Sequence, residues 1–103
     1  MDEQTLTTTA VQATIQPEGD MVSFSLPPLR SKMRAMVDSG VLHLTVDLAK
    51  VQMVDSSGLG LLIAAHNSLK KAGGQLVVIH ASDDILHLCK TMRIHQHFSV
   101  SGN

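Results

Sequence analysis

Hydrophobic and polar residues alternate in several short segments of this chain, which is the pattern of strands with one buried face. The alternation predicts strands at residues 11–15, 22–26 and 42–48. A Pro-Glu-Gly-Asp turn cluster at 17–20 separates the first two, so we expect them to form a hairpin. Residues 76–79 are apolar on both faces, as in a central parallel strand, and residues 98–100 predict a last edge strand.

Apolar residues recur at helical spacing in three further segments, which predicts three amphipathic helices. The first lies between Pro28 and Gly40, the second between Gly58 and Gly73, and the third begins at the expected N-cap Ser82. Their apolar stripes are Leu29, Met33, Met36 and Val37; Leu59, Leu62, Ile63, His66 and Leu69; and Ile85, Leu88, Cys89 and Met92.

The order of these elements predicts an α/β fold, with an N-terminal β-hairpin followed by alternating strands and helices on a mixed, mostly parallel sheet. Its length makes the chain one domain, residues 1–103, and the polar, threonine-rich residues 1–9 are expected to be frayed.

Composition narrows the range of functions. Hydrophobic residues make up 44% of the 103 residues, but only Phe24 and Phe98 are aromatic, so the expected core is aliphatic. The net charge is −1 and no basic stripe is present, which argues against nucleic-acid binding. A lone cysteine, Cys89, excludes an internal disulfide. With no signal peptide and no apolar run of membrane-spanning length, we expect a cytoplasmic protein without membrane insertion.

The most informative segment is the Asp-Ser-Ser-Gly-Leu-Gly stretch, residues 55–60, which we place between a strand and a helix. The first N–H groups of a helix have no internal partner, and together with the helix dipole they favour negative charge. Ser56 or Ser57 could therefore cap the helix when bare and carry a phosphate without unfolding it. Asp55 could cap the helix too, or hold the serine hydroxyl in place. Gly58 and Gly60 either allow close packing of the helix on the sheet, or Gly58 lets a kinase active site approach the serine.

Metal binding and catalysis are weakly supported. The six histidines, among them His95 and His97, offer no ligand set with a familiar spacing, so no metal and no cofactor are expected. Cys89 lies on an apolar helix stripe, which favours a packing role over a reactive thiol. Ser56 has no neighbouring base and no Gly-x-Ser-x-Gly elbow, so we expect no enzyme.

From about residue 11 to residue 100 the chain resembles a STAS domain, most closely the bacterial anti-sigma-factor antagonists. The resemblance rests on residues 46–48 (Val-Asp-Leu), residues 53–60 (Met-Val-Asp-Ser-Ser-Gly-Leu-Gly), and the Gly-Gly pair at 73–74 before an apolar strand. It implies phosphorylation at Ser56, with Ser57 as the rival site, and partner binding by Asp55, Ser56, Ser57, Gly58, Leu59 and Gly60.

The resemblance also implies the partners. They are a serine protein kinase of the histidine-kinase-like ATPase type, which doubles as the anti-sigma factor or binds a related target, and a PP2C-type phosphatase. The unphosphorylated form would bind its partner and phosphorylation would release it.

Two departures from the family bear on partner identity. Leu-Pro-Pro-Leu at 26–29 replaces a Gly-Glu-Leu-Asp-like turn, and the chain ends at Asn103 without a further helix. The alternative function is a constitutive STAS scaffold or accessory subunit, of the lipid-transporter or stress-complex type, without a phosphoswitch.

Overall fold

The computed structural model describes residues 11–102; the predicted frayed segment 1–9 and Asn103 lie outside the described residues. Its elements, in chain order, are β1 (Gln12–Ile15), the 3₁₀ turn η1 (Ser23–Ser25), α2 (Leu26–Asp38), β2 (His43–Asp47), α3 (Ser56–Lys71), β3 (Gln75–Ala81), α4 (Asp83–Thr91), the 3₁₀ turn η2 (Ile94–Gln96) and β4 (Ser99–Gly102).

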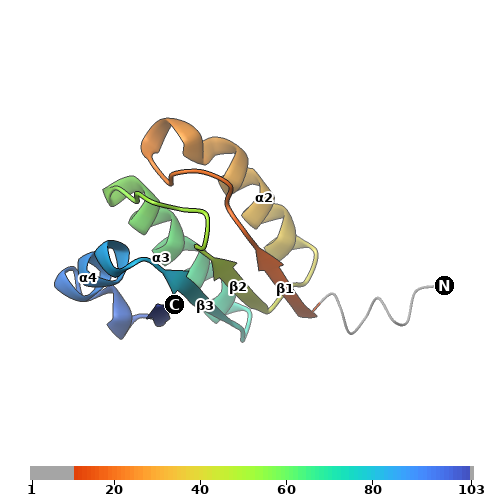
Figure 1. The fold of residues 1–103 in the computed structure, drawn as a ribbon. Coiled ribbons are helices and arrows are strands. Elements are labelled where there is room, and N and C mark those ends of the chain that lie inside the picture. Colours follow the sequence, from red (N-terminus) through yellow and green to blue (C-terminus); the bar gives the residue numbers. More distant parts are fainter. Residues whose placement is uncertain (1–10, 103) are drawn as a thin grey trace.

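The strands form one sheet in the order β1-β2-β3-β4, and every pair is parallel. Neighbouring strands are therefore joined by crossovers through α2, α3 and α4. Because crossovers of this kind are right-handed and the strand order never reverses, the three helices lie on the same face of the sheet. Figure 1 shows this two-layer arrangement, with the helices above the strands.

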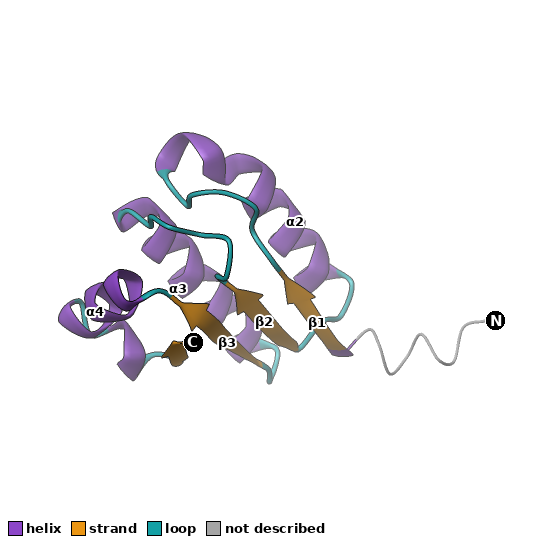
Figure 2. Cartoon of the chain, viewed as in Figure 1, coloured by secondary structure: helices purple, strands orange, loops and turns teal. Residues whose placement is uncertain are grey.

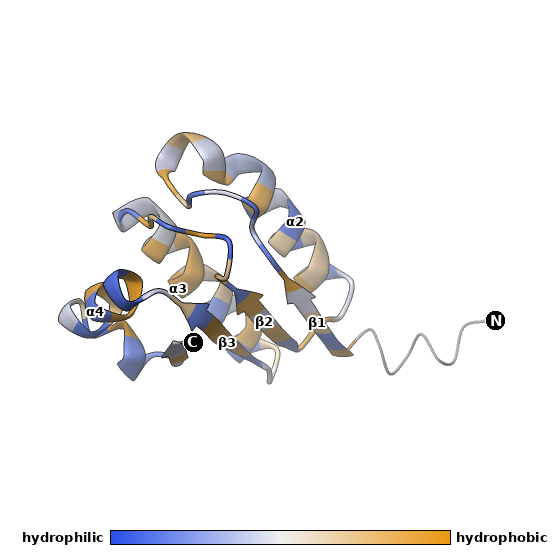
Figure 3. Ribbon diagram, viewed as in Figure 1, coloured by the Kyte–Doolittle hydropathy of each residue, from blue (hydrophilic) through white to orange (hydrophobic). Residues whose placement is uncertain are grey.

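The core lies between the sheet and these helices. Alternate residues of the central strands, Leu44 and Val46 in β2 and Leu76 and Val78 in β3, point into it and are at most 1% exposed. Helix α3 contributes more buried residues than α2 or α4, and Figure 3 shows its hydrophobic colouring beside the strands. The buried residues are almost all aliphatic, as the composition predicts.

The predicted α/β class is confirmed, but the prediction of an N-terminal hairpin is wrong. Residues 23–25 form η1 and Leu26 begins α2, while β1 pairs in parallel with β2. Within residues 11–102 the sheet is thus parallel throughout rather than mixed. Pro27 and Pro28 explain the difference, because they occupy the first helical turn, where a missing N–H costs nothing, and could not donate to a strand ladder.

The remaining elements agree with the sequence pattern apart from two details near the end. Ser82 caps α4 as expected, since its hydroxyl accepts a hydrogen bond from the Ile85 N–H at 3.2 Å. Met92, however, lies beyond α4 and is 54% exposed, so it does not belong to the apolar stripe. The last strand, β4, runs from Ser99 to Gly102 rather than over the predicted residues 98–100, and η2 precedes it.

His66 is the polar residue that α3 buries in the core, with 8% of its surface exposed. Its ring lies 5.5 Å from the Phe98 ring, and within residues 11–102 its Nδ1 atom has no hydrogen-bond partner. Burial lowers the pKa of His66 below its ordinary value of 6.5, and the charges of Lys70 and His97 lower it further. The folded protein therefore holds this ring neutral.

We expect this histidine to make the fold sensitive to acid. As the pH falls below 6.5, the unfolded chain binds a proton at His66 that the folded chain binds only at lower pH, so stability decreases. The variant His66→Leu should lose less stability than the wild type between pH 7.5 and pH 5.5, measured by urea unfolding. The exposed His87 provides the control: His87→Gln should lose as much as the wild type, and an unchanged pH dependence in His66→Leu would contradict the assignment.

Candidate functional site: the amino end of helix α3

Asp55 organises the amino end of α3. Its backbone is extended, and its Oδ1 atom accepts a hydrogen bond from the Gly58 N–H at 2.9 Å, which makes Asp55 the N-cap. Its carbonyl accepts from the Leu59 N–H at 3.0 Å. The first turn of the helix is thus held by the aspartate that precedes both serines. Of the capping alternatives that the sequence leaves open, the structure selects Asp55.

The same carboxylate also reaches the segment before α2. Its Oδ2 atom accepts a hydrogen bond from the Ser23 N–H at 3.0 Å, across 32 positions of sequence. The Gly58 N–H, followed by the Ser23 N–H, lowers the pKa of the Asp55 carboxyl below its ordinary value of 3.8. Asp55 is therefore ionised at neutral pH and joins α3 to η1.

The loops before α2 and before α3 run side by side above the sheet, as Figure 2 shows. The Met21 N–H donates to the Met53 carbonyl at 2.9 Å, and the Asp55 N–H donates to the Met21 carbonyl at 3.2 Å. Asp20 adds a second clamp, since its Oδ1 atom accepts from the N–H groups of Gln52 and Met53 at 3.2 and 3.1 Å. These bonds fix both loops around the start of α3.

Ser56 and Ser57 are the first two residues of α3, and both are exposed. Neither is the cap, so capping does not occupy their hydroxyls. The structure thus places two accessible hydroxyls at the amino end of a helix, where negative charge is favourable.

The other residues of the predicted partner-binding set divide into an accessible and a buried group. Asp55 is half-buried and Gly60 is exposed. Gly58 and Leu59 are buried, and Leu59 belongs to the core with 4% exposure. These two residues support the site from inside, while partner binding at the accessible ones stays a prediction.

The two glycines have different surroundings. A Cβ atom on Gly58 would collide with the Met21 carbonyl oxygen and lie 2.8 Å from the Val54 side chain. A Cβ atom on Gly60 would meet nothing within 4 Å. Close packing therefore explains Gly58, although the contact is with the loop before α2 and the end of the loop before α3. Gly60 has no packing role of this kind.

The sequence interpretation missed the contribution of residues 20–25. Asp20 and Ser23 hold the loops of the site, and Ser25 stabilises η1 by accepting from the Val22 N–H at 3.2 Å. The sequence signal that could have revealed this contribution is Asp20, at the end of the polar turn cluster 17–20. The expected hairpin concealed it, because a strand at 22–26 would turn these groups toward another strand.

A second polar cluster lies at the carboxyl ends of β2 and β3. The Asp47 Oδ1 atom is 2.9 Å from His80 Nδ1 and accepts from the Ala49 N–H, and its Oδ2 atom accepts from Gln16. The Ala49 N–H, followed by His80, lowers the pKa of Asp47. The cluster joins neighbouring loops and does not include Ser56.

Metal and thiol chemistry find little support in the part of the chain that the structure describes. Among residues 11–102, no three or more His, Cys, Asp or Glu side chains gather as a metal site would require. Cys89 is 1% exposed, and burial raises the pKa of its thiol, which disfavours the reactive thiolate. No helix in this range is long and apolar enough to cross a membrane.

Comparison with known proteins shows the family of the chain. A family model described as "Mlab, STAS domain" matches residues 5–100. The anti-sigma-B factor antagonist of Bacillus subtilis is 32% identical over 70 residues, which cover 68% of this chain and 63% of that protein. An α/β domain with an exposed serine at the start of a helix is the class of protein that the fold and the site define. The chain belongs to the STAS-domain family.

Solved structures show the same fold. SpoIIAA, an anti-sigma factor antagonist in its unphosphorylated form, superposes with a TM-score of 0.76 at 15% identity, covering 89% of this chain and 80% of that one. The Bacillus cell fate determinant SpoIIAA in its phosphorylated form gives 0.71 at 15%, covering 91% and 85%. The chain spans less than two thirds of the length of the curated relatives that it matches.

The contrast between the two glycines predicts opposite effects of one methyl group. Gly58→Ala should destabilise the fold by about 1–3 kcal/mol, because the methyl group forces the Met21 carbonyl away from the Asp55 N–H. Gly60→Ala should stabilise it by about 0.5–1 kcal/mol, because alanine is the better helix former and the space is open. Urea unfolding of both variants provides the measurement. Stabilisation by Gly58→Ala would show that the loop before α2 is not held against α3.

Proposed function

We propose that this protein is a phosphorylation-controlled partner-switching module of the anti-sigma-factor-antagonist kind. Its unphosphorylated form binds a target, and phosphorylation of Ser56 releases it. The observation that carries the proposal is the exposed hydroxyl of Ser56 in the first turn of α3, directly after an N-cap that does not use it.

The local structure suits a phosphate. Asp55 already satisfies the Gly58 N–H, so a modified Ser56 would not remove the cap. A phosphate carries a charge of about −1.5 to −2 at neutral pH, and the amino end of a helix favours such a charge. The neighbouring Asp55 carboxylate repels it, which directs the phosphate outward. Modification would therefore change the surface and leave the fold intact.

The expected effect on binding follows from desolvation. A charged phosphate enclosed in an interface without a compensating partner costs several kcal/mol, and about 1.4 kcal/mol changes affinity tenfold. An interface that covers Ser56 would thus release its partner on phosphorylation without any refolding of this domain.

The proposed partners follow from the relatives. One is a serine protein kinase of the histidine-kinase-like ATPase type, acting as anti-sigma factor or as a related target, and the other is a PP2C-type phosphatase. The curated relatives named anti-sigma-B factor antagonists support an anti-sigma factor as the target, and the SpoIIAA structures in both phosphorylation forms support a phosphorylated state; the kinase type and the phosphatase are those that the family resemblance implies. We place the protein in the cytoplasm and assign it no catalytic activity of its own.

Substitutions at Ser56 should separate stability from binding. Ser56→Ala should change the free energy of unfolding by no more than about 0.5 kcal/mol, because an exposed residue outside the cap contributes little. It should keep the partner bound. Ser56→Asp should be no less stable, owing to the helix dipole, yet bind more weakly. Thermal melts and pull-downs from the native host with tagged variants provide the test.

Site-resolved mass spectrometry of the protein from its host supplies the control. We expect Ser56 to carry phosphate over Ser57 by about three to one, because a phosphate on residue 56 lies nearest the end of the helix. Phosphate found mainly on Ser57 would show that Ser57, and not Ser56, is the switch residue. Equal pull-down yields for wild type, Ser56→Ala and Ser56→Asp would overturn the switch.

A charge at Gly60 should block the interface while the fold persists. Gly60→Glu places a carboxylate in open space on the exposed side of the first turns of α3, so it should fold at least as stably as the wild type. It should abolish partner capture even with unmodified Ser56. The matched control is Gly60→Ala, which should bind normally. Normal binding by folded Gly60→Glu would place the interface elsewhere.

A constitutive scaffold or accessory subunit is the second candidate. The observation that favours it is the Asp55 cap, because the site is already well ordered without any modification. The family model, described by the words "Mlab, STAS domain", is compatible with either function. Absence of phosphate from both serines in host cells, together with stable partner capture by Ser56→Asp, would favour this candidate.

A further inference from the structure

Three large hydrophobic side chains are conspicuously exposed among residues 11–102: Phe24 at 87%, Met53 at 59% and Met92 at 54%. Two of them lie on the loops that surround the site. Phe24 follows Ser23, whose N–H binds Asp55, and Met53 is bonded to Met21 and Asp20. Met92 follows α4, away from these loops.

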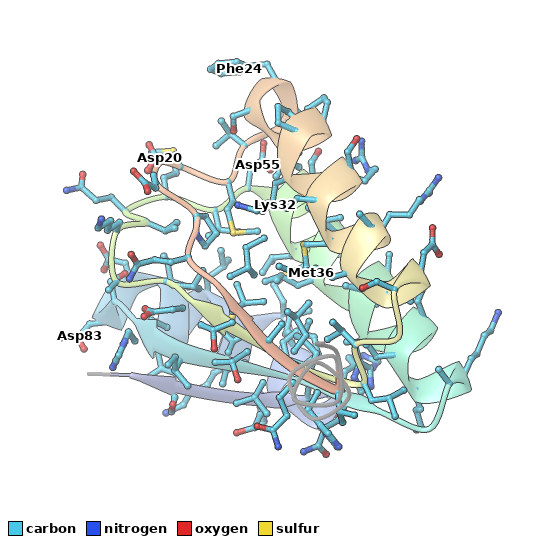
Figure 4. All side chains as sticks on the ribbon, turned by 90° about the vertical axis from the view of Figure 1, so that its right-hand side faces the viewer. Asp20, Phe24, Lys32, Met36, Asp55 and Asp83 are labelled. Atoms are coloured by element: carbon cyan, nitrogen blue, oxygen red, sulfur yellow. The ribbon has the colours of Figure 1, made fainter. Side chains whose placement is uncertain are left out.

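The backbone on both sides holds Phe24 in place. Before it, Ser23 is bound to Asp55; after it, the Ser25 hydroxyl lies 2.7 Å from the Asp20 carbonyl and accepts from the Val22 N–H. Leu26 is then buried at 1% exposure. Figure 4 shows the Phe24 ring projecting from the start of α2, at the same end of the molecule as Asp55. The backbone that carries the exposed ring is therefore held in place by the fold.

The surface around Phe24 is poor in charge. Residues 22–29 contain no charged side chain, and residues 51–62 contain one, Asp55, in a chain that is 17% charged. Both segments adjoin through the bonds of Asp55 and Met21. Exposed surface that lacks charge and carries an aromatic ring is typical of the centre of a protein interface.

We propose that the Phe24 ring inserts into an apolar pocket of the same partner whose binding depends on the phosphorylation state of Ser56. Phe24 is then the anchor residue of that interface. This inference rests on the proposed function, and it commits to the histidine-kinase-like ATPase as the occupant. The Asp55 carboxylate accepts from the Ser23 N–H, next to Phe24, and Asp55 itself directly precedes Ser56, so the segments that carry Phe24 and Ser56 are joined at Asp55. A pre-positioned aromatic side chain loses little conformational entropy on binding, which suits an anchor.

Photo-crosslinking in the native host tests the occupant. The crosslinking amino acid p-benzoylphenylalanine replaces Phe24, Gly60 or Met92 in three separate full-length variants, each checked for folding by circular dichroism. We expect crosslinks from positions 24 and 60 to a histidine-kinase-like ATPase, identified by mass spectrometry, and none to it from position 92. Adding Ser56→Asp should remove the crosslinks from both positions.

The three positions separate the two proposals. Capture of the ATPase from position 60 but not from position 24 would overturn the anchor and keep the proposed function. Capture from neither would overturn both. Capture of a second copy of this chain, or of any other protein, from position 24 would also overturn the anchor.

Affinity measurements then test how much the Phe24 ring contributes to binding. With the captured ATPase purified, Phe24→Ala should weaken binding by about 30-fold or more, the usual effect of removing an interface anchor. Phe24→Leu should retain part of the affinity. Met92→Ala, which truncates another exposed apolar residue on a different segment, should bind as the wild type does. Unchanged affinity of Phe24→Ala, with an unchanged melting temperature, would overturn the proposal.

Discussion

The site depends on the two hydrogen bonds that the Asp55 carboxylate accepts. One oxygen caps α3 through Gly58, and the other holds η1 through Ser23, so a single side chain joins two segments 32 positions apart. Both donors belong to the backbone. Backbone N–H groups are present whatever the side chains at positions 58 and 23, so the junction depends on the side chain of Asp55 alone. The cap and the loop therefore form one rigid surface.

Close contact beneath this junction limits the sequence. The Met21 carbonyl accepts from Asp55 and at the same time approaches Gly58 so closely that no side chain fits there. One turn further along α3, Leu62 is buried at 1%, while Gly60 faces open space. Helix α3 is thus anchored through one face and free on the other. A modification on the free face can change binding without a large change in stability.

This division gives a simple physical basis for a switch. The folded state does not use the hydroxyl of Ser56 as the cap, so the proposed phosphorylation would act on the interface alone. In the proposed interface, Phe24 is the neighbour of Ser23, whose N–H binds Asp55. The Phe24 ring would then strengthen binding of the partner, and a phosphate on Ser56 would weaken binding of the same partner at an adjacent point.

The sequence by itself determined the regular part of the structure. The periodicity of residues 42–48 and 76–79 gave the central strands, and the stripe from Leu59 to Leu69 gave α3, because burial against a sheet demands those spacings. The amino end of α3 was also readable, since Asp-Ser-Ser-Gly before an apolar helical stripe favours a helix start, although the stretch follows the loop after β2 and not a strand.

Only the tertiary structure decided the role of residues 20–25. Val22, Phe24 and Leu26 alternate as a strand would, but the proline pair and the bonds from Asp55 and Asp20 turn this segment into η1 and the start of α2. Local periodicity cannot reveal such bonds, because their donors and acceptors lie about 32 positions apart in the chain. The exposure of Phe24 followed for the same reason from the fold and not from the pattern. The choice of Asp55 over Ser56 as the cap rests on a local bond to the Gly58 N–H, and the sequence left it open because both residue types are good caps.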